Sequence, residues 1–249
     1  MKLAFSRPTS TDEEEQSLVE NFRSAGFDGL QLKSDQYWRY LDNPAAFKAR
    51  WDRYPGAASA LIVSGRIDDD GAGMLRKVFR FAGAVGSSLV IFCHGVSRGN
   101  LTFGDIRRYA RELSVLGKDA QDLGTRLSLH HHFDQPVMRR ADFDAFFDSV
   151  VFGTVGLTID TAHLAKSGIA DIAEVVRSFR NVIDNFHIKD FGEGNWRVLG
   201  EGTIDFSPVF DAIREIGYDG WVCADEESGA EIGKSMNQCG KFLREGLGR

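Results

Sequence analysis

The chain has 249 residues, 43% of them hydrophobic and 27% charged, with a formal net charge of −6 at pH 7. This length can bury a large core, and the acidic balance disfavours nucleic acid as the main partner. No apolar run approaches the ~18 residues of a membrane span, and the N-terminus lacks a signal-peptide pattern. The three cysteines form no CxxC motif. We therefore expect a soluble cytoplasmic protein with no membrane partner.

Strand-like apolar runs alternate with helical segments along the whole chain. The first unit is a strand over 2–6, followed at 10–14 (STDEE) by two overlapping capping boxes that predict the start of a helix. Glycine stops then separate helices from the strands that follow them, as expected of helix-to-strand loops, at Gly26, Gly86, Gly124 and Gly217.

The pattern predicts eight strands, over residues 2–6, 28–33, 58–64, 88–94, 126–132, 155–160, 183–189 and 220–226. It also predicts eight helices, centred on 11–24, 42–52, 72–84, 103–122, 140–149, 169–179, 206–216 and 229–246. Eight such pairs in about 250 residues predict a parallel (β/α)8 TIM barrel. An open doubly wound sheet is the competing architecture, but no G-x-G-x-x-G follows the first strand. No linker or composition break divides the chain, so we expect one domain over 1–249.

The histidines gather where such a barrel builds its active site. All of them fall at or just past the C-terminal end of a predicted strand: His94, His130, His131, His132, His163 and His187. Because the active site of a TIM barrel is formed at this end of the strands, the sequence predicts a divalent-metal site at the barrel mouth.

Alternation along each strand indicates which side chains face the mouth, because successive residues point to opposite sides. In strands five to seven the apolar set belongs against the helices, and the inward set contains His130, His132, Asp160, His187 and Lys189. His131 falls on the opposite face, where we expect it to pack or form hydrogen bonds. Strand eight is less decisive, and analogy with its neighbours places Asp225 and Glu227 inward.

Four possible metal ligands therefore converge from four adjacent strands: His130, Asp160, His187 and Asp225. Two imidazoles and two carboxylates suit transition metals better than Ca²⁺. Mn²⁺ is the first choice, with Co²⁺, Zn²⁺, Fe²⁺ and Mg²⁺ as alternatives. The competing interpretation is a set of buried, hydrogen-bonded polar groups. For His130 and Asp225, orienting the ligands is an equal alternative to binding the metal.

Other polar residues near the mouth have two interpretations each. His163 contacts the substrate or orients the metal ligands, with a plain loop histidine as the alternative, and His94 reaches the mouth or lies in the barrel wall. Lys189 acts on substrate or forms a salt bridge with Asp160 or Asp225.

Three further positions are weaker candidates. Arg197 is an anion or hydroxyl clamp, or a surface arginine. Gln31 and Lys33 could line the mouth, although solvated loop positions are the simpler interpretation. Trp196 stacks on a sugar or serves in packing.

Four segments between about 125 and 228 resemble, in order, elements of the xylose-isomerase-like barrel superfamily. They are the D-x-x-H element at 158–163 (TIDTAH), the H-x-K-D element at 185–190 (NFHIKD), the G-x-G-x-x-D-F loop at 199–206 (LGEGTIDF), and the final strand at 217–227. The N-terminal half matches only in its βα rhythm. The family comprises sugar and sugar-phosphate isomerases and epimerases, inosose and dehydroshikimate dehydratases, and apurinic endonucleases.

The resemblance implies metal ligands at Asp160, His187 and Asp225. Two positions depart from the family pattern, which usually has glutamate where this chain has His130 and Asp225. The first change removes one base of a two-glutamate epimerase mechanism, and the histidine run at 130–132 resembles the inosose dehydratase branch more closely.

These observations predict a metal-dependent isomerase or epimerase that acts through an enediolate on a polyhydroxylated carbonyl compound, a carbohydrate or cyclitol. Glu227 and His163 are the candidate bases, and Lys189 polarises an oxygen or protonates a leaving hydroxyl. The predicted substrate contacts are His132, His94 and Arg197.

A dehydratase of an inosose-like hydroxy-ketone is the runner-up, favoured by the missing strand-five glutamate. A three-metal nuclease would need more ligands than this mouth provides, and the chain is acidic. A catalytically inactive carbohydrate-binding barrel is the alternative outside the enzymes. The sequence leaves a homo-oligomer open.

Overall fold

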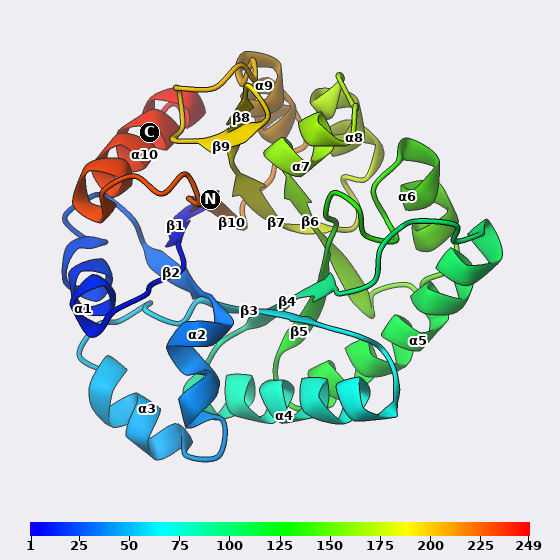
Figure 1. The fold of residues 1–249 in the computed structure, drawn as a ribbon, viewed down its shortest axis with the longest axis horizontal. Helices are drawn as coiled ribbons and strands as arrows, with labels where there is room; N and C mark the ends of the chain where they lie inside the picture. Colours follow the sequence, from blue (N-terminus) through cyan, green and yellow to red (C-terminus); the bar gives the residue numbers. More distant parts are fainter.

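Eight parallel strands close into a barrel in the computed structural model, which describes all 249 residues (Figure 1). In order around the barrel they are β1 (Lys2–Ser6), β2 (Gly29–Leu32), β3 (Ala60–Gly65), β4 (Leu89–His94), β5 (Arg126–His130), β6 (Val155–Asp160), β7 (Ile183–Ile188) and β10 (Trp221–Asp225). The predicted TIM barrel is confirmed, and each predicted strand corresponds to one strand of the structure.

The larger helices form a ring outside the strands (Figure 1). They are α1 (Asp12–Asn21), α3 (Pro44–Trp51), α4 (Asp69–Val85), α5 (Phe103–Asp122), α6 (Arg140–Phe147), α8 (Ile172–Ser178), α9 (Ser207–Glu215) and α10 (Ile232–Leu247). The Thr11 side chain caps α1 by accepting a hydrogen bond from the Glu14 backbone, and α4 ends at Gly86, whose φ of 77° is the left-handed conformation that glycine adopts readily. None of the helices combines the length and apolar character that a membrane crossing requires.

Two apolar layers hold the barrel together. Inside it, alternate residues of β3 and β4 form a small cluster: Ala60, Ile62, Leu89, Ile91 and Cys93. The intervening residues of the same strands pack outward against the helices in the main core, which includes Val90 and Phe92. Because His94 has the parity of Phe92, the strand turns its ring outward.

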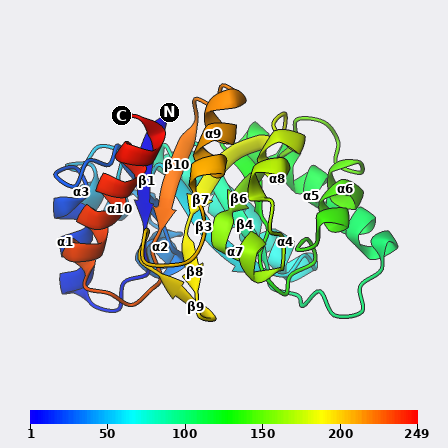
Figure 2. The same cartoon turned by 90° about the horizontal axis from the view of Figure 1, so that it is seen from above.

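Short elements at the C-terminal ends of the strands were not predicted. They are α2 (Ser34–Tyr37), the 3-10 turn η1 (Trp38–Tyr40), α7 (Thr161–Lys166) and the hairpin of β8 (Asp190–Gly192) with β9 (Asn195–Arg197). The hairpin turns through Glu193 and Gly194, which both have positive φ, 53° and 79°, as a type I′ turn requires. It projects from the end of the barrel opposite the two chain termini, which lie close together (Figure 2).

Strand five is shorter than predicted. Its pairing with β6 ends where His130 lies beside Thr158, so His131 and His132 belong to the following loop and not to the strand. Apolar alternation could not reveal this boundary, because all three residues are histidines.

Candidate metal centre

The predicted ligands meet at the C-terminal ends of β5, β6, β7 and β10. Two groups of three side chains place their ligand atoms within 4.8 Å of one another: His130, Asp160 and His163, and Asp160, His187 and Asp225. Every member is buried. Asp160 belongs to both groups, and it lies directly beside His187 in the β6–β7 register. The expected convergence of four strands is therefore present, and His163 joins it.

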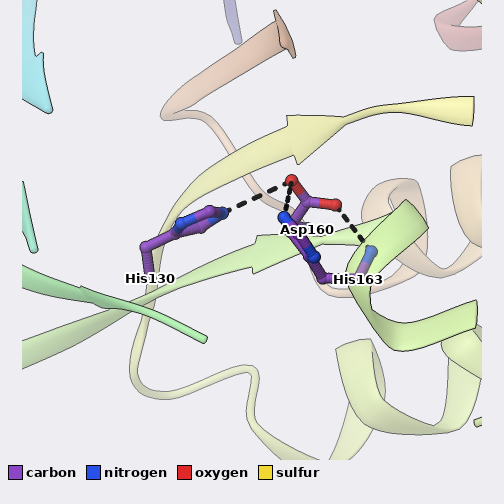
Figure 3. Close-up of side chains that lie close together, drawn as sticks. All are labelled: His130, Asp160 and His163. Atoms are coloured by element: carbon purple, nitrogen blue, oxygen red, sulfur yellow. Dashed lines mark hydrogen bonds and ion pairs between the residues drawn. The ribbon is translucent and has the colours of Figure 1, made fainter. Parts of the chain in front are cut away.

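Asp160 is the centre of this cluster (Figure 3). Its Oδ2 lies 3.3 Å from His130 Nε2 and 4.0 Å from His163 Nε2, while Oδ1 accepts a 2.9 Å hydrogen bond from the His163 backbone at the start of α7. Burial alone would raise the pKa of Asp160, but His163, His130 and Lys189 together hold that pKa well below its ordinary value. Asp160 is therefore a carboxylate, with Oδ2 facing the imidazoles.

His187 presents a free nitrogen to the cluster. The Gln31 side-chain N–H donates to Asn185 Oδ1 (2.7 Å), which turns Gln31 Oε1 toward His187 Nε2 at 2.8 Å. Nε2 must then carry the proton. The other ring nitrogen, Nδ1, is buried without a hydrogen-bond partner and lies 3.8 Å from Asp225 Oδ2. An unprotonated imidazole nitrogen beside carboxylates, fixed by a hydrogen bond on the far side of the ring, is the arrangement that metal ligands adopt. The residues present fit a divalent cation.

His130 has a different environment. Its Nδ1 lies 2.9 Å from Cys93 Sγ, inside the barrel, and its Nε2 faces Asp160. Burial acts to lower the pKa of His130, but Cys93 and Asp160 outweigh it and raise that pKa to about 10. Without a metal, His130 and Asp160 therefore form a buried ion pair.

Two lysines and two carboxylates form a charge cluster beside the metal ligands. Lys33 Nζ lies 2.7 Å from Asp225 Oδ1 and 2.7 Å from Glu227 Oε1. Lys189 Nζ lies 3.3 Å from Asp225 Oδ2 and also donates to Glu227 Oε2. Burial opposes all four charges, yet each sign stabilises the other, so the pKa values of Asp225 and Glu227 are lowered and those of both lysines are raised. Of the two salt bridges considered for Lys189, the one with Asp225 is present.

Three side chains form a wall beside the cluster. The rings of His132 and His163 are 3.6 Å apart, centroid to centroid, and the Trp196 ring lies 4.8 Å from His163 and 4.6 Å from Lys189 Nζ. The Phe133 backbone N–H donates to His163 Nδ1 at 3.3 Å, so a neutral His163 carries its proton on Nε2, toward Asp160. His132 Nδ1 donates to the Phe133 carbonyl at 2.9 Å and leaves its Nε2 free to accept.

Two predicted substrate contacts do not reach this cluster. The His94 ring packs against Tyr109 of α5, 4.4 Å away, because Cys93 is the inward residue at the end of β4. Arg197 is bound to Glu193 (2.6 Å) and to the Gly192 carbonyl within its own hairpin, whose alternation turns Trp196 toward the cluster instead. The placement of His94 and Arg197 gives no support to their predicted roles.

Three side chains of the cluster were missed or misjudged from the sequence. Gln31 and Lys33 are not solvated loop residues, because both project from the end of β2 into the buried network. Their alternation with Leu30 and Leu32 was the available signal. Cys93 could have been found by the same parity argument in β4.

His131 has the expected structural role. It accepts a 2.9 Å hydrogen bond from the Asp160 backbone and packs on Phe143.

Replacing Gln31 with methionine should weaken metal binding about 10- to 100-fold, because His187 would lose the hydrogen bond that fixes its tautomer and ring orientation. The measurement is a chelator-competition titration with Mn²⁺ and Zn²⁺. The matched control is Gln238→Met on α10, where the side chain bonds the Leu199 carbonyl away from the cluster. Equal affinities in the two variants would contradict an orienting role for Gln31.

Acid should destabilise the metal-free protein below pH 6.5. Burial lowers the pKa of His131 to about 3 and that of His132 to about 4, below the ordinary value of 6.5. The unfolded chain therefore binds more protons at these two positions in this window, so the contribution of His131 and His132 to stability is complete above pH 6.5 and is lost as the pH falls toward these values. The expected slope is at most roughly 1.4 kcal/mol per pH unit for His131, which is buried, and smaller for His132, which is partly exposed.

Urea unfolding at pH 7.5, 6.5, 5.5 and 4.5 measures this slope on chelator-treated protein. His131→Gln can still accept the Asp160 N–H, and it should remove the part of the pH slope that His131 contributes. A free energy of unfolding that stays constant from pH 7.5 to pH 4.5 would be incompatible with neutral buried histidines.

Comparison with known proteins gives two kinds of match. A family model described as "Xylose isomerase-like TIM barrel" matches residues 19–245. An inosose dehydratase of Lacticaseibacillus casei is 30% identical over 147 residues, which cover 51% of this chain and 49% of that protein. The chain thus matches about half the length of this relative.

Solved structures match almost the whole chain at low identity. The IOLI protein, solved with a bound zinc atom, superposes with a TM-score of 0.83 at 17% identity and covers 99% of this chain and 98% of its own. An L-ribulose 3-epimerase superposes with a TM-score of 0.82 at 19% identity, covering 99% and 94%. At these identities the structural matches establish the fold alone.

Proposed function

The chain belongs to the xylose isomerase-like TIM-barrel family, and from this premise we propose that it is a metal-dependent dehydratase of an inosose-like polyhydroxylated ketone. This family includes sugar epimerases and inosose dehydratases, and the chain holds a buried His/Asp group that could bind a metal ion. The choice of dehydratase over epimerase, which reverses the order suggested by the sequence alone, rests on one contact.

That contact is the hydrogen bond between Lys189 and Glu227. The lowered pKa of Glu227 makes it a carboxylate, which can accept a proton, and the raised pKa of Lys189 keeps it an ammonium, which can donate one. The two groups lie together on one side of the mouth. A base and an acid on the same side suit the loss of a proton and a hydroxide from one face of a substrate.

A divalent cation held by Asp160, His187 and Asp225, with His130 as a fourth ligand, would supply Lewis-acid stabilisation of the negative charge on substrate oxygens. These residues are proposed ligands. His163 is a weaker candidate ligand than His187, because the Phe133 N–H already occupies its Nδ1 lone pair and its Nε2 carries the proton. Mn²⁺ and Zn²⁺ are the ions to test first.

Dehydration requires that one side chain of this protein accept a proton and that another donate one. Glu227 takes the proton from the carbon beside the ketone, and the electrons of the C–H bond form the enediolate. The neighbouring C–O bond then breaks, and the leaving hydroxide takes a proton from Lys189 and departs as water. Because Glu227 and Lys189 share a hydrogen bond, the proton can pass from the carboxyl back to the amine, which restores both groups.

The other predicted contacts have subsidiary roles in this proposal. His132, with a free Nε2, binds a substrate hydroxyl, and Trp196 offers a ring face to the carbon skeleton. His163 donates from Nε2 toward Asp160 and is not the base.

A second candidate is an epimerase, which must protonate the enediolate on the opposite face. The specific observation in its favour is His132, which follows β5 while Glu227 follows β10, with β6 and β7 between them. Burial keeps the pKa of His132 near 4, so it is neutral and could accept or relay a proton.

Incubating the metal-loaded protein with an inosose in D₂O distinguishes the candidates by mass spectrometry and NMR. A dehydratase gives a product that has lost one water. An epimerase gives a product of unchanged composition with one deuterium in place of hydrogen. Neither change over a panel of inososes and ketoses, in a protein that retains its metal, would contradict both and favour a carbohydrate-binding barrel without turnover.

Glu227→Gln should lower the rate of either reaction on the order of 100-fold, because the amide cannot accept the substrate proton. Initial rates at saturating substrate provide the measurement. Glu201→Gln, which changes a carboxylate on the nearby loop that accepts from Gln238, is the control and should retain full activity. An active Glu227→Gln protein would transfer the role of base to His132.

A further inference from the structure

Exposed apolar side chains gather on one side of the molecule, outside the barrel. The three most exposed large hydrophobic residues of the chain, each at least 60% exposed, are Val115, Val151 and Phe152. Val115 lies on α5, and the other two lie in the loop between α6 and β6. That loop is fixed on α5, because the Val151 N–H donates to Ser114 Oγ at 3.0 Å and the Gln121 side chain donates to the Gly153 carbonyl at 2.7 Å. Neighbouring exposed apolar residues indicate an interaction surface, whereas scattered single ones do not.

Charged residues surround Val115 on the outer stripe of α5. Positions 108, 111, 115, 118 and 122 are three or four residues apart and therefore follow one face of the helix, with 112 and 119 beside them. Pairs at equal distances on either side of Val115 have opposite signs: Arg108 and Asp122, Arg111 and Asp119, and Glu112 and Lys118. The stripe therefore has no net charge, and reversing the helix about Val115 exchanges every sign.

Within one chain the basic residues of this stripe form only local contacts. Arg108 contacts Asp105 at 2.8 Å and Lys118 contacts Asp122 at 3.8 Å, each within about one turn of the same helix, and the two basic side chains are 62% and 71% exposed. Arg111 is exposed and takes part in none of the ion pairs of the chain. Exposed pairs contribute roughly 0–1 kcal/mol each, so little stability is lost when these side chains turn toward a partner.

A second copy of the stripe, turned end for end, complements the first. When two α5 helices pack antiparallel about a two-fold axis at Val115, each residue faces the position at equal distance on the other side, so all three pairs meet with opposite signs. Parallel helices would instead bring each charge against its own copy. An anionic membrane or a nucleic acid would gain nothing from a stripe with equal numbers of basic and acidic groups. We propose that the chain forms a homodimer through this face, with Val115 at the two-fold axis and Val151 and Phe152 enlarging the apolar contact.

This arrangement leaves both metal centres open. Because all strands of the barrel are parallel, α5 returns in the opposite direction between β4 and β5, in the outer ring of helices (Figure 1). Antiparallel α5 helices therefore place the two barrels head to tail, with their mouths at opposite ends of the dimer. The dimer is thus independent of the metal chemistry, and its test needs no substrate.

Sedimentation velocity over a concentration series measures the association of the chain, which should shift from monomer to dimer. Val115→Asp should abolish the dimer, because it brings two carboxylates together at the axis. Arg108→Glu should raise the dissociation constant roughly tenfold, since each dimer would contain two like-charge contacts with Asp122. The control is Lys241→Glu, which makes the same charge change beside Glu245 on α10, across the barrel from α5 (Figure 1), and it should dimerise like the wild type.

Mixing two weakened variants tests the antiparallel register. Asp122→Arg alone should weaken the dimer as Arg108→Glu does, but an equal mixture of the two should dimerise, because every altered residue then faces an opposite charge. Recovery in the mixture also shows that both variants are folded. This pair is preferred to the one with Asp119, which Arg76 of α4 already holds at 2.7 Å. A wild-type chain that stays monomeric at every concentration, a dimer that Val115→Asp or Arg108→Glu leaves intact, or a mixture that fails to associate would each overturn the proposal.

Discussion

Asp160→Asn should purify without bound metal and lose activity by about 10⁴-fold, because several kcal/mol of Lewis-acid stabilisation would disappear with the ion. Asp160 is the one side chain common to both ligand groups, and it is fully buried among three histidines and a lysine. Asparagine has the same shape and can still accept the α7 backbone N–H, so the change removes the charge and preserves the helix cap. Elemental analysis and the water-loss assay provide the measurements.

The control for this change is Asp171→Asn. Asp171 caps α8 by accepting from the Glu174 backbone at 2.9 Å, in the same way that Asp160 caps α7, but it lies outside the cluster. It should retain both metal and activity. If Asp160→Asn binds metal as tightly as the control, the proposed centre is wrong, and the His/Asp cluster is a hydrogen-bonded network only.

Arg98→Leu should lower the free energy of unfolding by about 3–5 kcal/mol, because it leaves a buried carboxylate without its partner. Arg98 follows β4 and binds Asp142 of α6 through two hydrogen bonds of 3.0 and 2.9 Å. The side chains are 7% and 1% exposed. This pair joins the β4–α5 loop to α6, so its loss should also loosen the loops after β4 and β5, the second of which carries His132. Urea unfolding gives the free energy.

Arg177→Leu is the control that distinguishes the loss of a buried ion pair from the loss of an exposed one. Arg177 contacts Glu215 at 2.7 Å, but these side chains are 45% and 55% exposed. Exposed pairs contribute roughly 0–1 kcal/mol, so this variant should unfold almost like the wild type. Equal losses in the two variants would mean that the Arg98 pair is no stronger than a surface contact.

The barrel was predictable because two periodic signals agreed along the entire chain. Apolar alternation identified all eight strands, and glycine stops such as Gly86 separated helices from strands. The short elements over the mouth escaped prediction, since they depend on local contacts and not on periodicity. For example, α7 begins at the end of β6, where the Asp160 side chain accepts the His163 N–H, and this cap is a single local contact with no repeating pattern.

The convergence at the mouth was predicted from strand parity, that is, from which alternate residues face inward. The errors came from extending parity past the end of β5 and from not applying it to β2 and β4. It brought Asp160 and His187 together correctly. Had it been applied to β4 and β2, it would have shown Cys93 facing inward, His94 facing outward and Gln31 entering the network. The hydrogen bonds that distinguish the proton positions of His163 and His187 depend on Phe133 and Gln31, which are distant from them in sequence, so no local pattern could reveal them.

The double duty of Asp160 also limits which ions the cluster can hold. Because one carboxylate oxygen already accepts the backbone N–H of the first turn of α7, the proposed ligand Asp160 would offer mainly its other oxygen to a cation and would bind it as a monodentate ligand. Calcium usually requires six to eight oxygens and often a bidentate carboxylate, whereas smaller transition-metal ions accept four or five single-atom donors. The hydrogen bond that caps α7 would thus make the site select smaller cations. Millimolar calcium should therefore fail to displace manganese or zinc from this barrel.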